Sequence, residues 1–243
     1  MLTANNVFKE RIIARDALKG VGYTCPVCEG LVILKRGAIK IAHFSHKYLG
    51  ECWWENESPE HLGFKQKLYD SYTGLGYKCE LEKVIADHKF VLDLFVDYKG
   101  AKVAIEVQLS EDSWEHILEK TKALNELGYY VLWLVGDPAL KTESERSSLL
   151  LYLMHAGFYF GRVYTITKNF TIKSNWGVSI DPEMEISALY FKYRTKTIID
   201  KKHYLPITNL NLLLTEAVLP KSGTKIKIAR FFDKHKDKEE IFD

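Results

Sequence analysis

Two β-rich segments joined by a Lys-Gly dipeptide at positions 99–100 constrain this chain more than any other feature of its sequence. The segments are FVLDLFVDY, residues 90–98, and AKVAIEVQL, residues 101–109. A two-residue turn fixes the pairing register of a β-hairpin, and here it sets Asp97 opposite Lys102, a favourable pair of charges. One face of the hairpin is then wholly apolar, so we expect that face to lie against a hydrophobic core.

The other face of this hairpin carries two carboxylates. The register sets Asp93 directly opposite Glu106, with Cβ atoms about 5 Å apart, and it places Gln108 farther along the same face. Like charges in this arrangement repel each other, whereas a divalent cation would bind oxygens of both and offset the repulsion. We therefore predict that Asp93 and Glu106 are ligands of a hard divalent cation.

Helical and β-rich patterns surround the hairpin. Ser58 and Pro59 form a typical helix start, and the apolar residues that follow recur at near-helical spacing. A β-rich run then precedes the hairpin, and a second helix follows it from about Trp114. The run YYVLWLV, residues 129–135, is continuously apolar, which is typical of a strand buried on both faces. The predicted element order over residues 57–140 is αβββαβ.

Cysteine and histidine spacing predicts a zinc ribbon in residues 1–56. A CPVC motif is followed, after 14 intervening residues, by an HFSH motif, which together supply Cys25, Cys28, His43 and His46. The intervening segment has the pattern of a β-hairpin, which would return the histidines to the cysteines and complete a tetrahedral Zn²⁺ site. Cys52 is an alternative to one histidine as the fourth ligand. A cysteine pair without metal, reduced or redox-active, is the alternative interpretation of CPVC.

Charge is distributed unevenly, although the formal net charge is only +2. Residues 1–50 and 141–243 are basic, whereas residues 51–140 are acidic. A basic flank attracts phosphates, and a local excess of carboxylates suits a divalent cation. Solvated surface explains a charge run equally well, so specific positions must decide between these interpretations.

The remaining sequence predicts a third region and no membrane partner. Residues 141–243 combine a helical pattern near residues 145–154 with β-rich runs, so we expect a C-terminal α+β extension. No apolar run is long enough to cross a bilayer of roughly 30 Å. The N-terminal residues lack the uninterrupted apolar core of a signal peptide, and we expect a cytoplasmic protein.

These motifs together resemble the CoiA-like nuclease family of competence proteins. The resemblance covers roughly residues 20–140 and rests on CPVC, KIAHFSH, SPEHLGFK, FVLDLFV, AIEVQLS and YYVLWLV. More broadly, an αβββαβ order with Asp on the second strand and Glu-Val-Gln on the third resembles the PD-(D/E)xK, or restriction-endonuclease-like, core. The resemblance implies a metal-dependent deoxyribonuclease that hydrolyses phosphodiester bonds in DNA, with a structural zinc.

The family pattern assigns roles to four carboxylate and amide residues. Asp93 and Glu106 would be the Mg²⁺ ligands, and Glu60 would be the carboxylate on the first helix. Gln108 stands where most PD-(D/E)xK enzymes have a lysine, and glutamine contributes no positive charge. We therefore expect a lysine from elsewhere, with Lys65 on the first helix preferred over Lys120 on the second.

DNA contacts are then expected from the basic flanks and from the first helix. In the ribbon the candidate phosphate contacts are Lys35, Arg36, Lys40 and Lys47, with Phe44 or Tyr48 available to stack on unpaired bases. Residues 192–203 mix basic and aromatic side chains and are a second candidate. His61 either contacts the phosphate or packs within the fold. The sequence leaves open whether the DNA is single- or double-stranded.

Two other function classes remain open. A nuclease-fold protein that binds DNA without cutting it and assists recombination is compatible with the absent lysine, and recombination proteins would then be partners. A zinc-ribbon scaffold that acts through protein partners is the third class. A homodimer is compatible with cutting both strands, but the sequence carries no interface signature. The pathway could be competence, recombination, defence or mobile-element biology.

Overall fold

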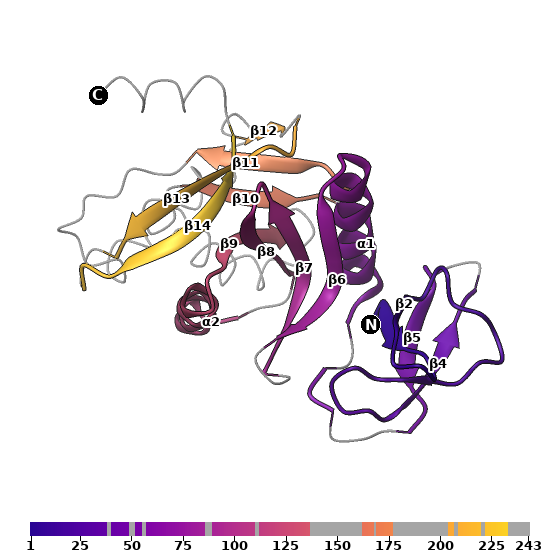
Figure 1. The fold of residues 1–243 in the computed structure, drawn as a ribbon. Helices are drawn as coiled ribbons and strands as arrows, with labels where there is room; N and C mark the ends of the chain where they lie inside the picture. The colour runs from indigo at the N-terminus through magenta and orange to yellow at the C-terminus, as the bar shows by residue number, and fades with distance from the viewer. Residues whose placement is uncertain are drawn as a thin grey trace. The chain divides into compact units, whose positions relative to one another are not determined.

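A computed structural model describes two compact units, Met1–Asp97 and Tyr98–Asp243. The described residues are 1–37, 40–48, 52–54, 57–85, 89–109, 112–136, 162–167, 169–176, 204–206, 209–219 and 222–232. They contain the helices and strands drawn in Figure 1, and the fold is mixed α/β. Within these residues, no helix is long and apolar enough to span a membrane.

An antiparallel sheet opens the first unit. Its strands are β1 (Thr3–Asn5), β2 (Arg11–Ile13), β3 (Tyr23–Thr24), β4 (Leu31–Lys35) and β5 (His43–His46), in the order β2-β1-β3-β4-β5. Strands β4 and β5 pair with Lys35 opposite His43, which confirms the predicted hairpin between the CPVC and HFSH motifs. Phe44 is buried in the core of this sheet against Tyr23, with ring centroids 5.0 Å apart. The prediction that Phe44 is available to stack on bases is therefore wrong.

The first unit continues with helix α1 (Pro59–Gly74) and strands β6 (Lys78–Ile85) and β7 (Phe90–Tyr98), which pair antiparallel. The predicted helix start is confirmed, because the Ser58 hydroxyl accepts a hydrogen bond from the backbone N–H of His61 at 3.1 Å and Pro59 opens the first turn. Leu62 of α1 packs with Leu2 and with Leu81 of β6 in one buried cluster. This shared core joins the first strand of the chain to α1 and β6.

The second unit is built on a mixed sheet with parallel and antiparallel strand pairs. Its elements are β8 (Ala101–Gln108), α2 (Trp114–Glu126), β9 (Tyr130–Gly136), β10 (Arg162–Ile166), β11 (Ile172–Trp176), β12 (Tyr204–Pro206), β13 (Leu212–Val218) and β14 (Lys225–Phe231). Strand β9 pairs parallel with β8, β10 and β14, and its residues from Val131 to Gly136 are buried. The buried strand predicted at residues 129–135 and the element order αβββαβ are confirmed.

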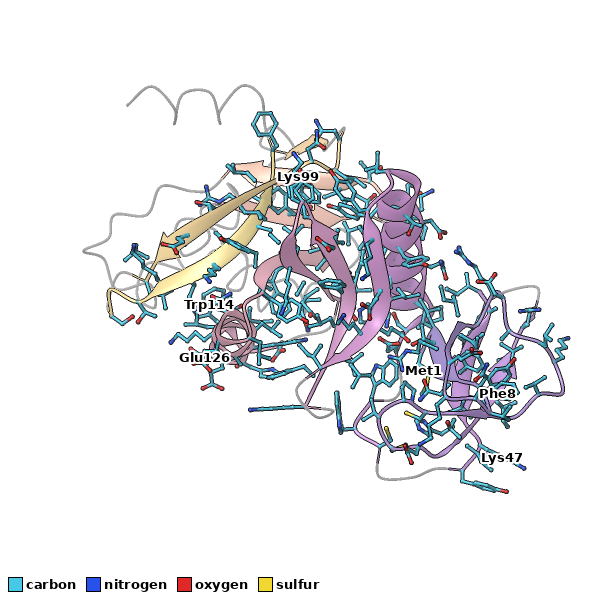
Figure 2. The ribbon with its side chains drawn as sticks, viewed as in Figure 1. Met1, Phe8, Lys47, Lys99, Trp114 and Glu126 are labelled. Atoms are coloured by element: carbon cyan, nitrogen blue, oxygen red, sulfur yellow. The ribbon has the colours of Figure 1, made fainter. Side chains whose placement is uncertain are left out.

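The turn between β7 and β8 has the predicted length. Strand β7 ends at Tyr98 and β8 begins at Ala101, and the two residues between them, Lys99 and Gly100, have φ values of 55° and 88°. Positive φ at both central positions is the mark of a type I′ turn, whose twist suits a two-residue hairpin. Lys99 is labelled at this turn in Figure 2.

The predicted apolar face of β7 and β8 is buried, and central residues of the opposite face are buried as well. Leu92, Leu94 and Ile105 are fully buried, as expected. Asp93 and Glu106, on the face predicted to bind metal, are buried too, with 9% and 2% of their surface exposed. Buried carboxylates are costly unless they are paired or bind a cation, so their surroundings bear directly on function.

The C-terminal extension is described only in part. Strands β10 and β11 fall within the predicted β-rich runs and pair antiparallel. The helix expected near residues 145–154 and the basic aromatic segment 192–203 lie outside the described residues. The predicted domain boundaries, after residues 56 and 140, stay predictions.

The turn provides a test of the hairpin. We expect Gly100→Ala to lower the free energy of unfolding by about 1–2 kcal/mol, because an L-residue pays for the left-handed conformation. A Cβ at Gly100 would meet no atom within 4 Å, so the cost would be conformational rather than steric. Urea unfolding measures the change, and Lys99→Gly, which relieves a positive φ, serves as the control. Equal stability of Gly100→Ala and the wild type would argue against the type I′ turn.

Candidate functional site

One group of potential metal ligands lies in the N-terminal sheet region. The ligand atoms of Cys25, Cys28, His46 and Cys52 all lie within 4.8 Å of one another. The Sγ atoms of Cys25 and Cys52 are 4.0 Å apart, and Cys28 Sγ is 3.2 Å from His46 Nε2. Three thiols and an imidazole form a common tetrahedral ligand set for structural zinc, so this group could bind Zn²⁺.

The turn that carries the first two cysteines is held by its own backbone. The N–H of Cys25 donates to the carbonyl of Gly30 at 2.8 Å, and the N–H of Glu29 donates to the carbonyl of Cys25 at 2.9 Å. The N–H of Val27 points at Cys25 Sγ from 3.4 Å, as expected at a zinc knuckle. A Cβ at Gly30 would come within 3.3 Å of Cys28 Sγ, so glycine leaves room for this ligand.

The structure differs from the predicted ligand set at one position. His43 lies outside the group, and its Nδ1 is 2.9 Å from the carbonyl oxygen of Ile41. Both histidines belong to strand β5, and residues three apart in a strand point to opposite faces, so only one of them can face the cysteines. Cys52, the alternative ligand, takes the fourth position.

Burial controls the protonation of these thiols. It raises the pKa of Cys25 to about 12 and also raises the pKa of Cys52. Zinc binds thiolates, so metal binding at this site must displace protons. The affinity for zinc should consequently fall as the pH is lowered.

A second group of charged residues lies in the same unit, where α1 faces strands β6 and β7. We call it the Lys65 cluster, and its members are Glu57, His61, Lys65, Glu82 and Asp93. His61 Nε2 is 3.1 Å from Asp93 Oδ2, and His61 Nδ1 is 3.5 Å from Glu57 Oε1. Burial disfavours the charged imidazole, but Asp93 and Glu57 outweigh this effect and raise the pKa of His61. Ligand atoms of Glu57, His61 and Asp93 lie within 4.8 Å of one another, close enough to hold a cation.

Lys65 lies at the centre of this cluster and is fully buried. Its Nζ contacts Glu57, lies 2.5 Å from Glu82 Oε1 and lies 3.7 Å from Asp93 Oδ1. Burial alone would lower its pKa, but the three carboxylates more than offset that effect and raise the pKa of Lys65. The lysine preferred from sequence is therefore a charged neighbour of Asp93.

Glu82 connects this cluster to the first strand of the chain. Its buried carboxylate accepts hydrogen bonds from the backbone N–H groups of Leu2 at 2.8 Å and Thr3 at 2.9 Å, and from the Thr3 hydroxyl at 3.0 Å. Burial would raise the pKa of Glu82, but Lys65 and the backbone donors lower it. Glu82 has a φ of 53° inside β6, a left-handed conformation that costs energy for a residue with a side chain. Nothing in the local sequence marks this role.

Glu60, the predicted helix carboxylate, does not belong to the cluster. It is exposed in the first turn of α1, whereas Glu57, which precedes the helix, makes the contacts with Lys65 and His61. Glu57, His61 and Lys65 are spaced four residues apart, which places their side chains on one side of a helix. This spacing was the sequence signal for their contacts. Sequence reasoning missed it because Glu57 lies outside the predicted helix.

A smaller polar group lies in the second unit. Glu106 of β8 forms an ion pair with Lys120 of α2, and Lys120 Nζ lies 2.9 Å from Glu106 Oε2. Lys120 also lies 5.5 Å from the centre of the Trp133 ring, and the Trp133 indole donates to the Thr121 hydroxyl at 3.0 Å. Gln108 is half-buried at the end of β8. Each predicted acid therefore has one of the two candidate lysines beside it.

Metal analysis tests the ligand set. We expect the purified wild type to carry zinc and Cys52→Ser to lose most of it, because Cys52 supplies a ligand thiolate. His43→Ala should retain zinc, since its ring lies outside the group. Zinc released by acid and quantified per protein chain measures both variants. Loss of zinc in His43→Ala with retention in Cys52→Ser would restore the original prediction.

Removal of Lys65 tests the charged cluster. We expect Lys65→Met to lower the free energy of unfolding by about 3–5 kcal/mol, because it leaves buried carboxylates without their cation. Lys67→Met, at an exposed position two residues along α1, should change it by less than about 0.5 kcal/mol. Denaturant unfolding compares the two. Equal effects would mean that the buried charges are compensated without Lys65.

Comparison with known proteins agrees with these features. The family model described as "Competence protein CoiA, N-terminal domain" matches residues 6–55, and "Competence protein CoiA, nuclease-like domain" matches residues 57–159. Competence protein CoiA of Bacillus subtilis (strain 168) is 29% identical over 126 residues, which cover 51% of this chain and 34% of that protein. The match thus spans about a third of the length of that relative. No solved structure matches the chain significantly. Because the two domain models follow each other along the sequence, the chain belongs to the competence protein CoiA family.

Proposed function

We propose that this protein is a metal-dependent deoxyribonuclease with a PD-(D/E)xK core that acts in DNA processing linked to competence. The observation that supports the proposal is the type I′ turn at Lys99 and Gly100, because the hairpin register predicted from a two-residue turn pairs Asp93 with Glu106. The family's nuclease-like domain adds support, because it covers both strands.

The residues present suit a hard divalent cation. In the first unit, Asp93 and Glu57 offer carboxylate oxygens, which Mg²⁺ prefers, and Mn²⁺ also accepts an imidazole such as His61. In the second unit, Glu106 offers a further carboxylate. The three carboxylates of the Lys65 cluster face Lys65, His61 and the N-terminal ammonium, which lies 3.5 Å from Glu57 Oε2. When bound, such an ion polarises the phosphoryl oxygen and lowers the pKa of a coordinated water.

The side chains of the protein would then position the metal and the phosphate. Asp93 and Glu106 would hold the metal, and Lys65 would orient Asp93 from 3.7 Å. Lys120 would orient Glu106 from 2.9 Å. Gln108 donates a hydrogen bond to the attacking water or to a phosphate oxygen, and the two lysines supply the positive charge that glutamine lacks.

One observation favours a second function, a nuclease-fold protein that binds DNA without cutting it. Glutamine occupies the position of the usual lysine, and both nearby lysines are already bound by carboxylates. With Lys65 and Lys120 held by these carboxylates, neither lysine would meet the developing charge, so hydrolysis would be slow and DNA binding would persist. Such a protein would act as an accessory of recombination.

Cleavage assays test the nuclease proposal. We expect the purified protein to cut labelled single-stranded or duplex DNA with Mg²⁺ or Mn²⁺. Asp93→Asn and Glu106→Gln should each lower the rate by more than about 10²-fold, since the loss of a metal ligand exceeds the effect of an outer-shell change. Glu60→Gln, at an exposed carboxylate outside the cluster, is the matched control.

The outcomes separate the two functions. Cleavage that survives both substitutions would refute this metal site. Absence of cleavage with every metal, combined with intact DNA binding and intact folding, would favour the accessory function.

A further inference from the structure

Two aromatic side chains of the N-terminal region stand out because they are exposed. Tyr48 has 67% and Trp53 has 59% of its surface accessible. The neighbouring Trp54 is 7% exposed and packs in the core of the same region, so Trp53 is not needed to fill that core. A large aromatic ring exposed to water carries an unfavourable hydration free energy that no packing contact offsets. Such exposure favours a role in binding.

The two aromatic residues flank ligands of the same candidate zinc site. Tyr48 follows His46 by two residues, and Trp53 directly follows Cys52. The ligand atoms of His46 and Cys52 lie within 4.8 Å of each other. The backbone segments that carry Tyr48 and Trp53 are therefore brought close together at their zinc-ligand neighbours.

Positive charge accompanies these rings. Residues 1–54 contain eight Lys and Arg residues against four Asp and Glu residues. Lys47 is exposed, with its Nζ 5.4 Å from the centre of the Tyr48 ring, and Figure 2 shows it projecting from the surface. Arg36, also predicted to contact phosphates, is exposed and donates to the carbonyls of Ala14 at 2.8 Å and Ala17 at 3.0 Å.

The chemistry fits unpaired bases better than a duplex. Aromatic faces bind bases by stacking, and this requires bases that are not already stacked in a double helix. The described part of residues 1–54 contains no α-helix that could enter a major groove. A cation beside the ring adds attraction for the phosphate backbone.

We propose that Tyr48 and Trp53 form a base-stacking site for single-stranded DNA, with Lys47 contacting the adjoining phosphate. The inference rests on the proposed function only in taking DNA as the ligand. It adds the form of the nucleic acid and the residues that hold it. The site would present a single strand to the protein without reading its sequence.

Binding assays on the full chain test this site. The probe is a fluorescent oligothymidine strand, compared with a hairpin duplex of mixed sequence, in buffer without added Mg²⁺ or Mn²⁺ so that cleavage does not interfere. We expect Tyr48→Ala and Trp53→Ala each to weaken single-strand binding by about 5- to 150-fold, the range for loss of one stacked base. Trp53→Phe should restore most of the affinity, since it keeps an aromatic face.

Phe8→Ala is the matched control, because Phe8 is 80% exposed in the same region but is distant in sequence from the zinc ligands. Its affinity should equal that of the wild type, and zinc content should be unchanged in every variant. Unchanged single-strand affinity in Tyr48→Ala and Trp53→Ala would overturn the proposal and favour a protein partner for this surface. An equal loss in Phe8→Ala, or equal losses for duplex and single strand, would also overturn it.

The result separates this site from the nuclease. Single-strand binding that depends on Tyr48 and Trp53, in a protein that cuts no DNA, would support the stacking site and refute the nuclease. Cleavage that depends on Asp93 and Glu106, with affinity independent of the two aromatic residues, would support the nuclease and refute the stacking site.

Discussion

The buried ammonium group of Lys65 is the interaction on which the first unit depends. It is bound by carboxylates from three places in the chain: Glu57 before α1, Glu82 in β6 and Asp93 in β7. A charge buried without partners would cost several kcal/mol of folding free energy. Each element that carries one of these carboxylates must therefore keep its position so that the buried charges stay paired. The ion pairs are therefore less a source of stability than a constraint on geometry. They hold Asp93 in place whether or not a metal is bound.

Glu82 extends this constraint to the N-terminal sheet. Its carboxylate accepts from the backbone N–H groups of Leu2 and of Thr3, which begins β1, while it binds Lys65. Leu2 also packs with Leu62 and Leu81. The left-handed conformation of Glu82 is an energetic cost that these contacts offset. The boundary predicted after residue 56 separates two sequence patterns, yet the hydrogen bonds and the core cross it.

The features that could be predicted from sequence are those set by local chemistry. Ser58 and Pro59 begin a helix because of their capping and backbone properties, and Lys99-Gly100 forms a turn because two residues with positive φ suffice. The errors arose where tertiary placement decides. Their spacing alone suggested that His43 and His46 bind the same metal ion, but residues three apart in strand β5 point to opposite faces. Glu60 lay inside the predicted helix and Glu57 outside it, and only the packing of α1 shows which of them meets Lys65.

The network also bears on how the zinc region and the charged cluster influence each other. A zinc ion held by Cys25, Cys28, His46 and Cys52 would organise the small sheet to which β1 belongs. If the sheet loses its order, β1 no longer supplies the N–H donors that satisfy Glu82. A buried carboxylate without those donors competes more strongly for the Lys65 ammonium, which weakens the hold of Lys65 on Asp93. The candidate zinc ligands and Asp93 would thus be linked through the contacts of Glu82 with Leu2, Thr3 and Lys65, although none of these ligands belongs to the Lys65 cluster.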